Sequence, residues 1–242
     1  MAEAILELKD IEKVYGTRIK TKVLHGVSLK FEPNSFNAII GQSGSGKSTL
    51  LNIMGTLDNP TSGSVTIKGM TTNAMKKKAL AKLRNETIGF VFQYHYLLPE
   101  FTAKENILMP YWIRKAKVPK EVEAYADELI EVVGISEVAH NPAFEMSGGQ
   151  QQRTALARAL LNKPSIVLAD EPTGSLDSRT TDKVYDLLRT INRTYGTTFI
   201  VITHDRRVAE KADRIIQLED GNIEMDMTTQ QGGISDESAR HQ

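Results

Sequence analysis

The stretch from Gly41 to Thr49, GQSGSGKST, constrains the fold of this chain more than any other part of its sequence. It fits the pattern G-x-x-x-x-G-K-[ST], in which a glycine-rich loop wraps backbone N–H groups around the phosphates of a nucleotide. An apolar run at 36–40 precedes it, and a helical pattern at 48–54 follows it. A glycine- and serine-rich turn that matches by accident is the alternative, but the order of strand, loop and helix argues against it. This order predicts a nucleotide-binding α/β core, because the helix also directs its positive N-terminal end toward the phosphates.

Each position of this loop has an expected task. The Lys47 ammonium is expected to reach the β- and γ-phosphates, and the Ser48 hydroxyl is expected to ligate Mg²⁺. The glycines permit left-handed turns and a close approach of the backbone to phosphate. The residues expected to contact the nucleotide are Gly41, Gln42, Ser43, Gly44, Ser45, Gly46, Lys47, Ser48 and Thr49.

The composition argues against several other classes of protein. The 242 residues include 30 basic and 30 acidic side chains, so bulk charge does not indicate nucleic-acid binding. Cysteine is absent, which excludes disulfides and thiolate metal sites. No apolar run approaches the ~18 residues that cross a bilayer, and the N-terminus lacks the apolar core of a signal peptide. We therefore expect a cytoplasmic protein, in which any role at a membrane requires a partner.

Two carboxylates and a histidine follow apolar runs like the one before the loop. The apolar residues 166–169 are followed by Asp170 and Glu171. Neighbouring positions on a strand point in different directions. Asp170 is therefore expected to hold the Mg²⁺ shell, and Glu171 to face the attacking water. His204 follows the run 199–203, where a histidine can sense the γ-phosphate. A polar strand end and a surface histidine are the simpler alternatives.

Gln93 and Tyr15 are further candidates for the site. Gln93 follows the apolar strand 88–92, and α/β proteins bind ligands at the carboxyl ends of their strands. On the sequence alone, it can equally be a polar residue that begins a loop. Tyr15 could stack on a base, although a tyrosine in this setting is more often part of a core or an edge strand.

Two kinds of additional structure are expected around the core. The short runs 5–8, 23–31 and 65–67 alternate in hydrophobicity and predict an antiparallel patch beside the nucleotide. Residues 94–145 predict a helical insertion, in which Thr102 to Glu105 has the form of a capping box.

Aromatic residues are concentrated near this insertion. Seven of the fifteen Phe, Tyr and Trp residues lie between 90 and 112. Such density is either core or, where it is exposed, a protein-docking groove. Beyond Met227, the polar composition predicts a disordered tail at 227–242.

A second candidate anion site begins the helical run 151–161. It consists of Ser147, Gly148, Gly149 and Gln150. An ordinary N-cap serine with flexible glycines is the simpler interpretation. One nucleotide cannot easily use two such nests from one subunit, so the two motifs together indicate a head-to-tail dimer with ATP between the subunits.

With Gln93, SGGQ at 147–150, LADE at 168–171, SLD at 175–177 and His204 in this order, the chain resembles the ATP-binding cassette (ABC) ATPases. The resemblance covers about residues 4–226. It implies a P-loop NTPase (RecA-like) α/β core with an antiparallel β subdomain and a helical signature subdomain at about 94–160.

The resemblance also implies roles for single residues. Tyr15 corresponds to the aromatic residue that stacks on adenine, and Gln93 to the residue that touches Mg²⁺ or the attacking water and couples to a membrane subunit. The signature Ser147-Gly148-Gly149-Gln150 corresponds to the motif that binds the γ-phosphate of ATP held by the opposing subunit. Its preceding residue is commonly leucine and is Met146 here, a change of little volume. The remaining correspondences are Asp170 as the Walker B aspartate, Glu171 as the general base or water-orienting carboxylate, Asp177 as the D-loop aspartate at the dimer interface, and His204 as the switch histidine.

Within the family, LLPEFTAKENILMP at 97–110 is most similar to the lipoprotein-releasing members, in a branch shared with macrolide exporters. The resemblance implies an ATPase that uses ATP and Mg²⁺ and closes as two copies around two ATP molecules. It also implies a separate integral membrane permease that docks near residues 93–112 and holds the chain at the cytoplasmic face of the inner membrane. A cell-division type of ABC ATPase, which regulates a membrane complex without transport, is the main alternative. A soluble ABC protein of translation or DNA repair and a P-loop kinase fit less well, and no nucleic-acid partner is expected.

Overall fold

The computed structural model describes residues 3–115, 117–173, 178–204, 209, 211–230 and 233–236. Of the site residues expected from the sequence, Asp177 lies outside this described part. All other candidates lie within it.

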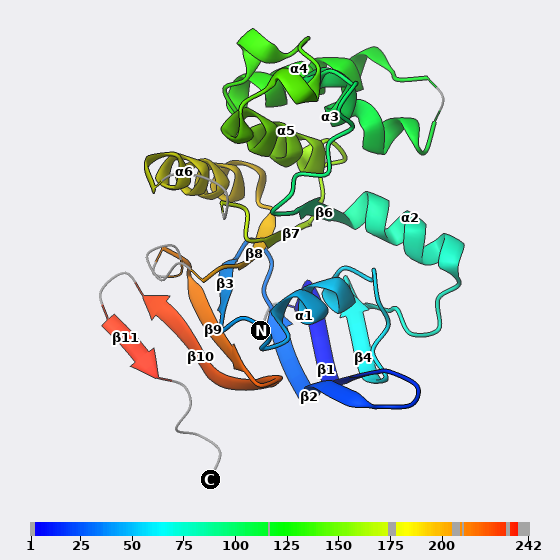
Figure 1. Cartoon of the computed structure of the whole chain (residues 1–242), viewed down its shortest axis with the longest axis vertical. Helices are drawn as coiled ribbons and strands as arrows, with labels where there is room; N and C mark the ends of the chain where they lie inside the picture. The colour runs from blue at the N-terminus through cyan, green and yellow to red at the C-terminus, as the bar shows by residue number, and fades with distance from the viewer. Residues whose placement is uncertain are drawn as a thin grey trace.

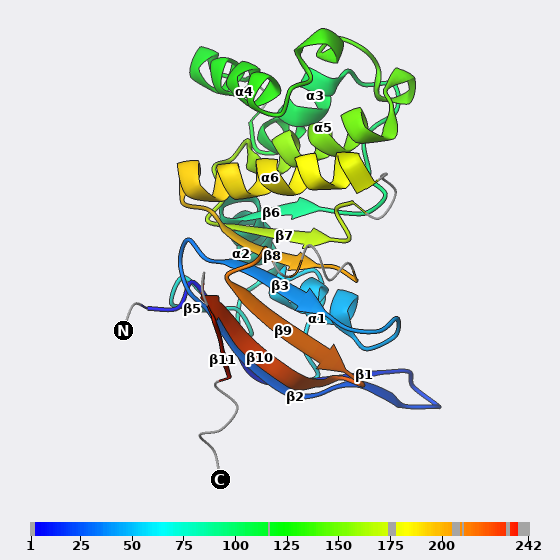
Figure 2. The same cartoon turned by 90° about the vertical axis from the view of Figure 1, so that its left-hand side faces the viewer.

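A seven-stranded sheet forms the centre of the molecule (Figure 2). Its strand order is β11-β10-β9-β3-β8-β7-β6, and the five strands from β9 to β6 run parallel. The strands are β3 (Phe36–Ile40), β6 (Ile88–Val91), β7 (Ile166–Asp170), β8 (Thr198–Ile202), β9 (Arg214–Glu219), β10 (Asn222–Gln230) and β11 (Gly233–Asp236). The central strands are apolar at almost every position because both faces of the sheet are covered.

Each face of this sheet packs into its own core. Along β7, Val167 and Ala169 face one core, whereas Ile166 and Leu168 face the other. The first core is completed by helices α5 (Gly148–Leu160) and α6 (Ser178–Tyr195), and the second by helix α1 (Lys47–Met54) and a smaller sheet (Figure 1). Because successive side chains of a strand point to opposite faces, each central strand contributes to both cores, and the sheet lies between the two layers that cover it.

The smaller sheet is antiparallel and has the order β2-β1-β4-β5. It contains β1 (Leu6–Tyr15), β2 (Thr21–Phe31), β4 (Ser62–Ile67) and β5 (Met70–Thr71). Its inward residues, such as Leu8, Leu29 and Val65, are buried against the second core. The antiparallel patch expected from the alternating runs is confirmed.

Three helices lie beyond the sheet at one end of the molecule (Figure 1). They are α3 (Ala103–Trp112), α4 (Lys120–Val132) and α5, and they pack on one another. Helix α3 begins with the expected capping box, in which Thr102 and Glu105 satisfy each other's backbone N–H groups. Helix α2 (Lys77–Thr87) leads directly into β6. The helical insertion is therefore present, and α5 belongs to it.

The C-terminal part of the chain differs from the expectation of disorder from residue 227. Strand β10 continues to Gln230, and Met227 to Gln230 pair with β11. Met227 and Thr228 pair with Ile215 and Arg214 of β9, and residues 227–230 pair with β11 on the other side. Residues 237–242 lie outside the described part. In the residues that the structure describes, no helix is both long and apolar enough to cross a membrane.

Candidate nucleotide-binding site

A cavity of about 460 Å³ opens where the parallel strands end. The residues that line it come from four strand ends and from the glycine-rich loop. They are Val23, Gly41, Ser43, Gly44, Gly46, Lys47, Ser48, Thr49, Gln93, Asp170, Glu171, Ile202 and His204. Segments separated by more than 160 residues thus meet in one place.

The glycine-rich loop requires glycine at particular positions. Gly44 and Gly46 have φ values of 84° and 102°, which lie in the left-handed region. A Cβ atom at Gly46 would lie 3.0 Å from Leu24 Cδ2 and 3.1 Å from the carbonyl oxygen of Val23. The backbone can turn here only without a side chain, and the turn leads directly into the first residue of α1.

The Lys47 ammonium folds back over this loop. Its Nζ donates hydrogen bonds to the carbonyl oxygens of Gly41 (2.9 Å) and Gln42 (2.6 Å). Burial lowers the pKa of Lys47, while the negative charges of Glu171 and Asp170 act in the opposite direction. The ammonium is therefore held beside the loop by weak neutral acceptors, which an anionic ligand can replace.

Asp170 lies in contact with the first helical turn after the loop. Burial raises the pKa of Asp170, while a hydrogen bond from Ser48 and the charge of Lys47 act in the opposite direction. A hydroxyl and a carboxylate that already touch are oxygen donors of the kind that Mg²⁺ prefers, with phosphate and water oxygens completing its shell. The residues present therefore fit a magnesium ion bound together with a nucleotide.

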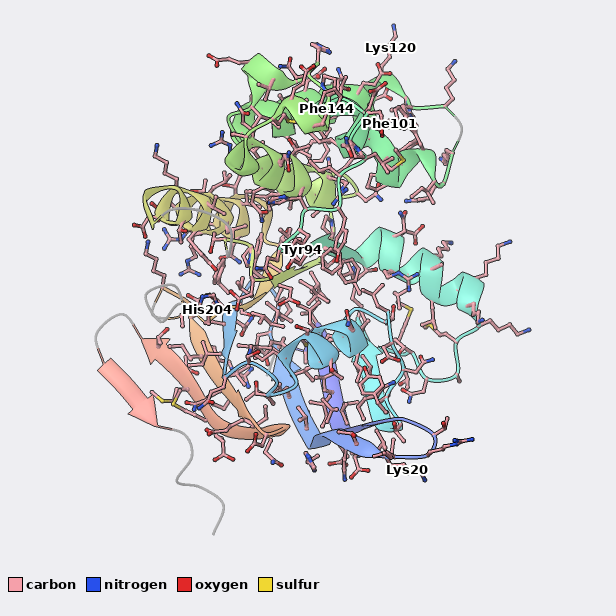
Figure 3. The ribbon with its side chains drawn as sticks, in the orientation of Figure 1. Lys20, Tyr94, Phe101, Lys120, Phe144 and His204 are labelled. Atoms are coloured by element: carbon pink, nitrogen blue, oxygen red, sulfur yellow. The ribbon has the colours of Figure 1, made fainter. Side chains whose placement is uncertain are left out.

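Glu171 and His204 form a pair at the mouth of the cavity. His204 Nδ1 lies 2.9 Å from Glu171 Oε1. The backbone of Glu171 has a φ of 45°, which is uncommon for a residue with a side chain, and its N–H donates to the carbonyl of Ile202. The Glu171 side chain is 18% exposed and that of His204 is 73% exposed, so the histidine lies on the outside of the pair (Figure 3).

Tyr15 is not among the residues that line the cavity. Its hydroxyl donates to Asp58 Oδ2 at 2.8 Å, and the Lys13 ammonium lies 4.8 Å from the centre of its ring. Burial and the neighbouring Asp58 raise the pKa of Tyr15, while Thr49 of the loop is within hydrogen-bonding reach. The tyrosine thus lies at the end of β1 next to the loop, on the edge of the site.

The SGGQ segment is likewise apart from this cavity. Ser147 is the N-cap of α5, where its Oγ accepts a hydrogen bond from the Gln150 N–H, and Gln150 Oε1 accepts one from the Ser147 N–H. Ser147 and Gly148 are exposed, and a Cβ atom on Gly148 would meet nothing within 4 Å. In a single chain, the segment is an ordinary N-cap that leaves open space in front of the helix.

A groove of about 490 Å³ lies next to the aromatic segment and extends beyond the range expected for docking. It includes Tyr96, Met109 and Pro110 from that range. It also takes in α2, through Ala81, Arg84 and Asn85, and the end of α5 with the turn after it, through Arg158, Ala159 and Asn162. No local pattern in the sequence marks the contribution of α2 or that of Arg158.

The glycine-rich loop, the half-buried Asp170 beside Ser48 and the Glu171–His204 pair define a nucleotide-hydrolysing protein of the phosphate-loop class. Comparison with protein families matches residues 24–174 to the family described as ABC transporter. The chain belongs to this family and is an ATPase.

Two curated relatives carry the name of the same lipoprotein-releasing system. Lipoprotein-releasing system ATP-binding protein LolD 1 of Rhodopseudomonas palustris is 50% identical over 221 residues, which cover 90% of this chain and 98% of the relative. The corresponding LolD protein of Anaeromyxobacter dehalogenans is 47% identical over 227 residues, which cover 93% and 95%.

A similar solved structure is the dimeric post-hydrolysis state of the ATP-binding cassette MJ0796 bound to ADP and Pi. It is 41% identical to this chain, has a TM-score of 0.86, and is matched over 93% of this chain and 99% of that one.

Proposed function

We propose that two copies of this chain close head to tail around two ATP molecules. Each ATP is held by the loop Gly41–Thr49 of one copy and by Ser147-Gly148-Gly149-Gln150 of the other. One observation carries the proposal: the cavity gathers the loop, Gln93, Asp170, Glu171 and His204, but none of the SGGQ residues lines it. The dimer of the similar cassette with ADP and Pi supports this arrangement.

The chemistry follows from the residues around the cavity. Glu171 orients the attacking water and accepts its proton, because its carboxylate is the shielded member of the pair with His204. Lys47 and His204 stabilise the negative charge on the transferring phosphoryl group. Ser48, Asp170 and Gln93 hold Mg²⁺, which supplies further positive charge beside the phosphate oxygens. Tyr15 stacks on the adenine, and Asp177 contacts the partner copy.

The membrane partner is proposed to be a separate permease. The apolar groove, which Phe90, Phe92 and Tyr96 help to line, accepts a helix of that permease. This contact holds the chain at the cytoplasmic face of the inner membrane. The names of the two LolD relatives support lipoprotein release as the process that is driven. Release of lipoproteins from proteoliposomes that contain the copurified permease tests this role. ATPase stimulation without release would favour the regulatory, cell-division type of function instead.

The variant Glu171→Gln tests the core of the proposal. Its amide is isosteric but cannot accept a proton, so we expect kcat to fall by about 10²–10⁴-fold. ATP binding remains, and an ATP-bound dimer accumulates on size-exclusion chromatography. The control variant Glu137→Gln changes an exposed carboxylate far from the cavity and is expected to hydrolyse ATP normally. Full turnover by Glu171→Gln, or its failure to dimerise with ATP, would overturn the assigned role.

A further inference from the structure

The backbone after Gln93 has a conformation that its residues do not favour. His95 and Tyr96 have φ values of 58° and 48°, so two consecutive residues with side chains are left-handed. Such geometry persists only where the surroundings enforce it, and it is concentrated at functional sites. The question is which contact enforces it here.

Arg158 of α5 supplies that contact. Its Nη1 donates to the carbonyl oxygen of Tyr96 at 2.6 Å, and its Nη2 donates to that of His95 at 2.5 Å. Burial lowers the pKa of Arg158 to about 10. In the described part of the chain no carboxylate forms an ion pair with this guanidinium, so the two carbonyls take up its charge.

The same segment is anchored at two further points. The His95 side chain is 8% exposed and is buried against Gln151 and Gln152 of α5. Three residues after His95, the Leu98 N–H donates to Asn106 Oδ1 of α3, and Asn106 Nδ2 donates to the carbonyl of Leu98. The loop is therefore fixed to the helical part of the molecule rather than to the sheet that it leaves.

The position of Arg158 connects three regions. Gln93, two residues before His95, lines the nucleotide cavity, whereas Tyr96 and Arg158 line the apolar groove. Ser147, at the other end of α5, begins the signature segment. The ten residue-to-residue steps from Gly148 to Arg158 span about 15 Å at 1.5 Å per step, so a rigid helix joins the two ends.

We propose that Arg158 is a positioning residue that fixes Gln93 in the nucleotide cavity and couples the loop to the signature segment through α5. It does not touch the nucleotide. This inference rests on the proposed function, because it assumes that Gln93 and the signature act in ATP hydrolysis. A molecule bound in the groove would contact Tyr96 of the loop and Arg158 of α5, and so it would act on both of the segments that Arg158 joins.

The variant Arg158→Lys tests the inference, because an ammonium keeps the charge but lacks the planar fork that reaches two carbonyls at once. We expect kcat to fall about 10-fold, while KM for ATP changes less than about 2-fold because the loop Gly41–Thr49 is untouched. Hydrogen exchange at residues 94–98 is expected to become faster without a change across β7 and β8. Arg193→Gln, an exposed change on α6, is the control and is expected to match the wild type in all three measurements.

The outcomes separate the inference from the proposed function. If Arg158→Lys keeps kcat within 2-fold, or if its exchange rises throughout the molecule, Arg158 is not a specific positioning residue. If instead Glu171→Gln fails to form an ATP-bound dimer, the proposed function itself is wrong.

A second measurement uses the wild type and does not depend on the stability of the variant. Binding of the copurified permease is expected to slow exchange at His95 and Tyr96, as well as at the first turn of α5. Protection confined to the groove would contradict the coupling.

Discussion

At the scale of single residues, the surroundings of Tyr15 explain how a surface aromatic can have a fixed orientation. Asp58 accepts hydrogen bonds from both Tyr15 and Lys13, at 2.8 Å and 2.7 Å. Burial alone would raise the pKa of Asp58, but the hydrogen bonds from Lys13 and Tyr15 outweigh it and lower the pKa. Since Tyr15 remains 41% exposed, the ring is held in place and still available to a base.

Two substitutions of Tyr15 separate stacking from this hydrogen bond. Tyr15→Ala removes the ring, and base–aromatic stacking is worth about 1–3 kcal/mol, so we expect KM for ATP to rise about 5- to 100-fold. Tyr15→Phe keeps the ring and leaves Asp58 paired with Lys13, so its KM is expected to stay within about 3-fold of the wild type. Steady-state ATPase kinetics measure both values. Equal KM values for the two variants would show that the ring does not contact the base.

At the scale of secondary-structure elements, α3 and α5 begin with the same N-terminal capping motif in different surroundings. Both start with a capping box, Thr102 with Glu105 in α3 and Ser147 with Gln150 in α5. In α3, the backbone N–H and hydroxyl of Thr102 lower the pKa of Glu105, and the box joins the helix to the preceding chain. In α5, the box is exposed and faces open space. We therefore expect the first to have only a structural task and the second to exchange its hydrogen bonds for those of a ligand.

The matched variants Thr102→Ala and Ser147→Ala test this difference. Loss of an N-cap hydroxyl costs about 1 kcal/mol in the free energy of unfolding, and we expect that loss in both, by urea denaturation. Only Ser147→Ala is expected to weaken the ATP-bound dimer and to lower kcat, by about 10-fold or more. If both variants keep the wild-type rate, the Ser147 hydroxyl has no role beyond the cap.

At the scale of the whole molecule, the parallel sheet assembles the cavity. Gly41 follows β3, Gln93 follows β6, Asp170 ends β7 and His204 follows β8, and these strands are neighbours with their carboxyl ends on one side (Figure 2). The signature segment lies on the helical subdomain, outside this cavity (Figure 1). In the proposed dimer, a second copy would therefore bring an SGGQ segment to each ATP.

A mixture of two inactive variants tests whether the site is shared. Gly148→Asp fits the open space before α5, and a carboxylate at a helix N-terminus favours folding, so its stability is expected to match the wild type. Its charge would nevertheless repel the γ-phosphate and prevent the ATP-bound dimer. Lys47→Ala is expected to be inactive, because it lacks the ammonium proposed to contact the phosphates.

Mixed dimers of these two variants contain one intact site, made of the loop of the Gly148→Asp copy and the signature of the Lys47→Ala copy. We therefore expect the mixture to recover ATP hydrolysis that neither variant shows alone. No recovery at any mixing ratio would argue that each chain hydrolyses ATP within a single copy or that both sites must act together.

The sequence alone determined the elements and the residues at their ends. The alternating runs, the apolar strands, the capping box at 102–105 and the glycine-rich loop depend on local periodicity and backbone preference, and the structure has all of them. Because polar residues followed apolar strands, Gln93, Asp170, Glu171 and His204 could be nominated together before their positions in space were known.

Only the tertiary structure decided the contacts between distant segments. No local sequence pattern predicts that Arg158 donates to carbonyls 62 and 63 residues away. The same is true of the hydrogen bonds that Asp58 accepts from Tyr15 and Lys13, and of the contribution of α2 to the groove. The strand pairing of residues 227–230, which their polar composition does not predict, likewise depends on partner strands: β9 pairs with residues 227 and 228, and β11 pairs with residues 227–230. Local patterns report which face of an element is apolar, but which groups meet depends on how the layers pack around the two cores.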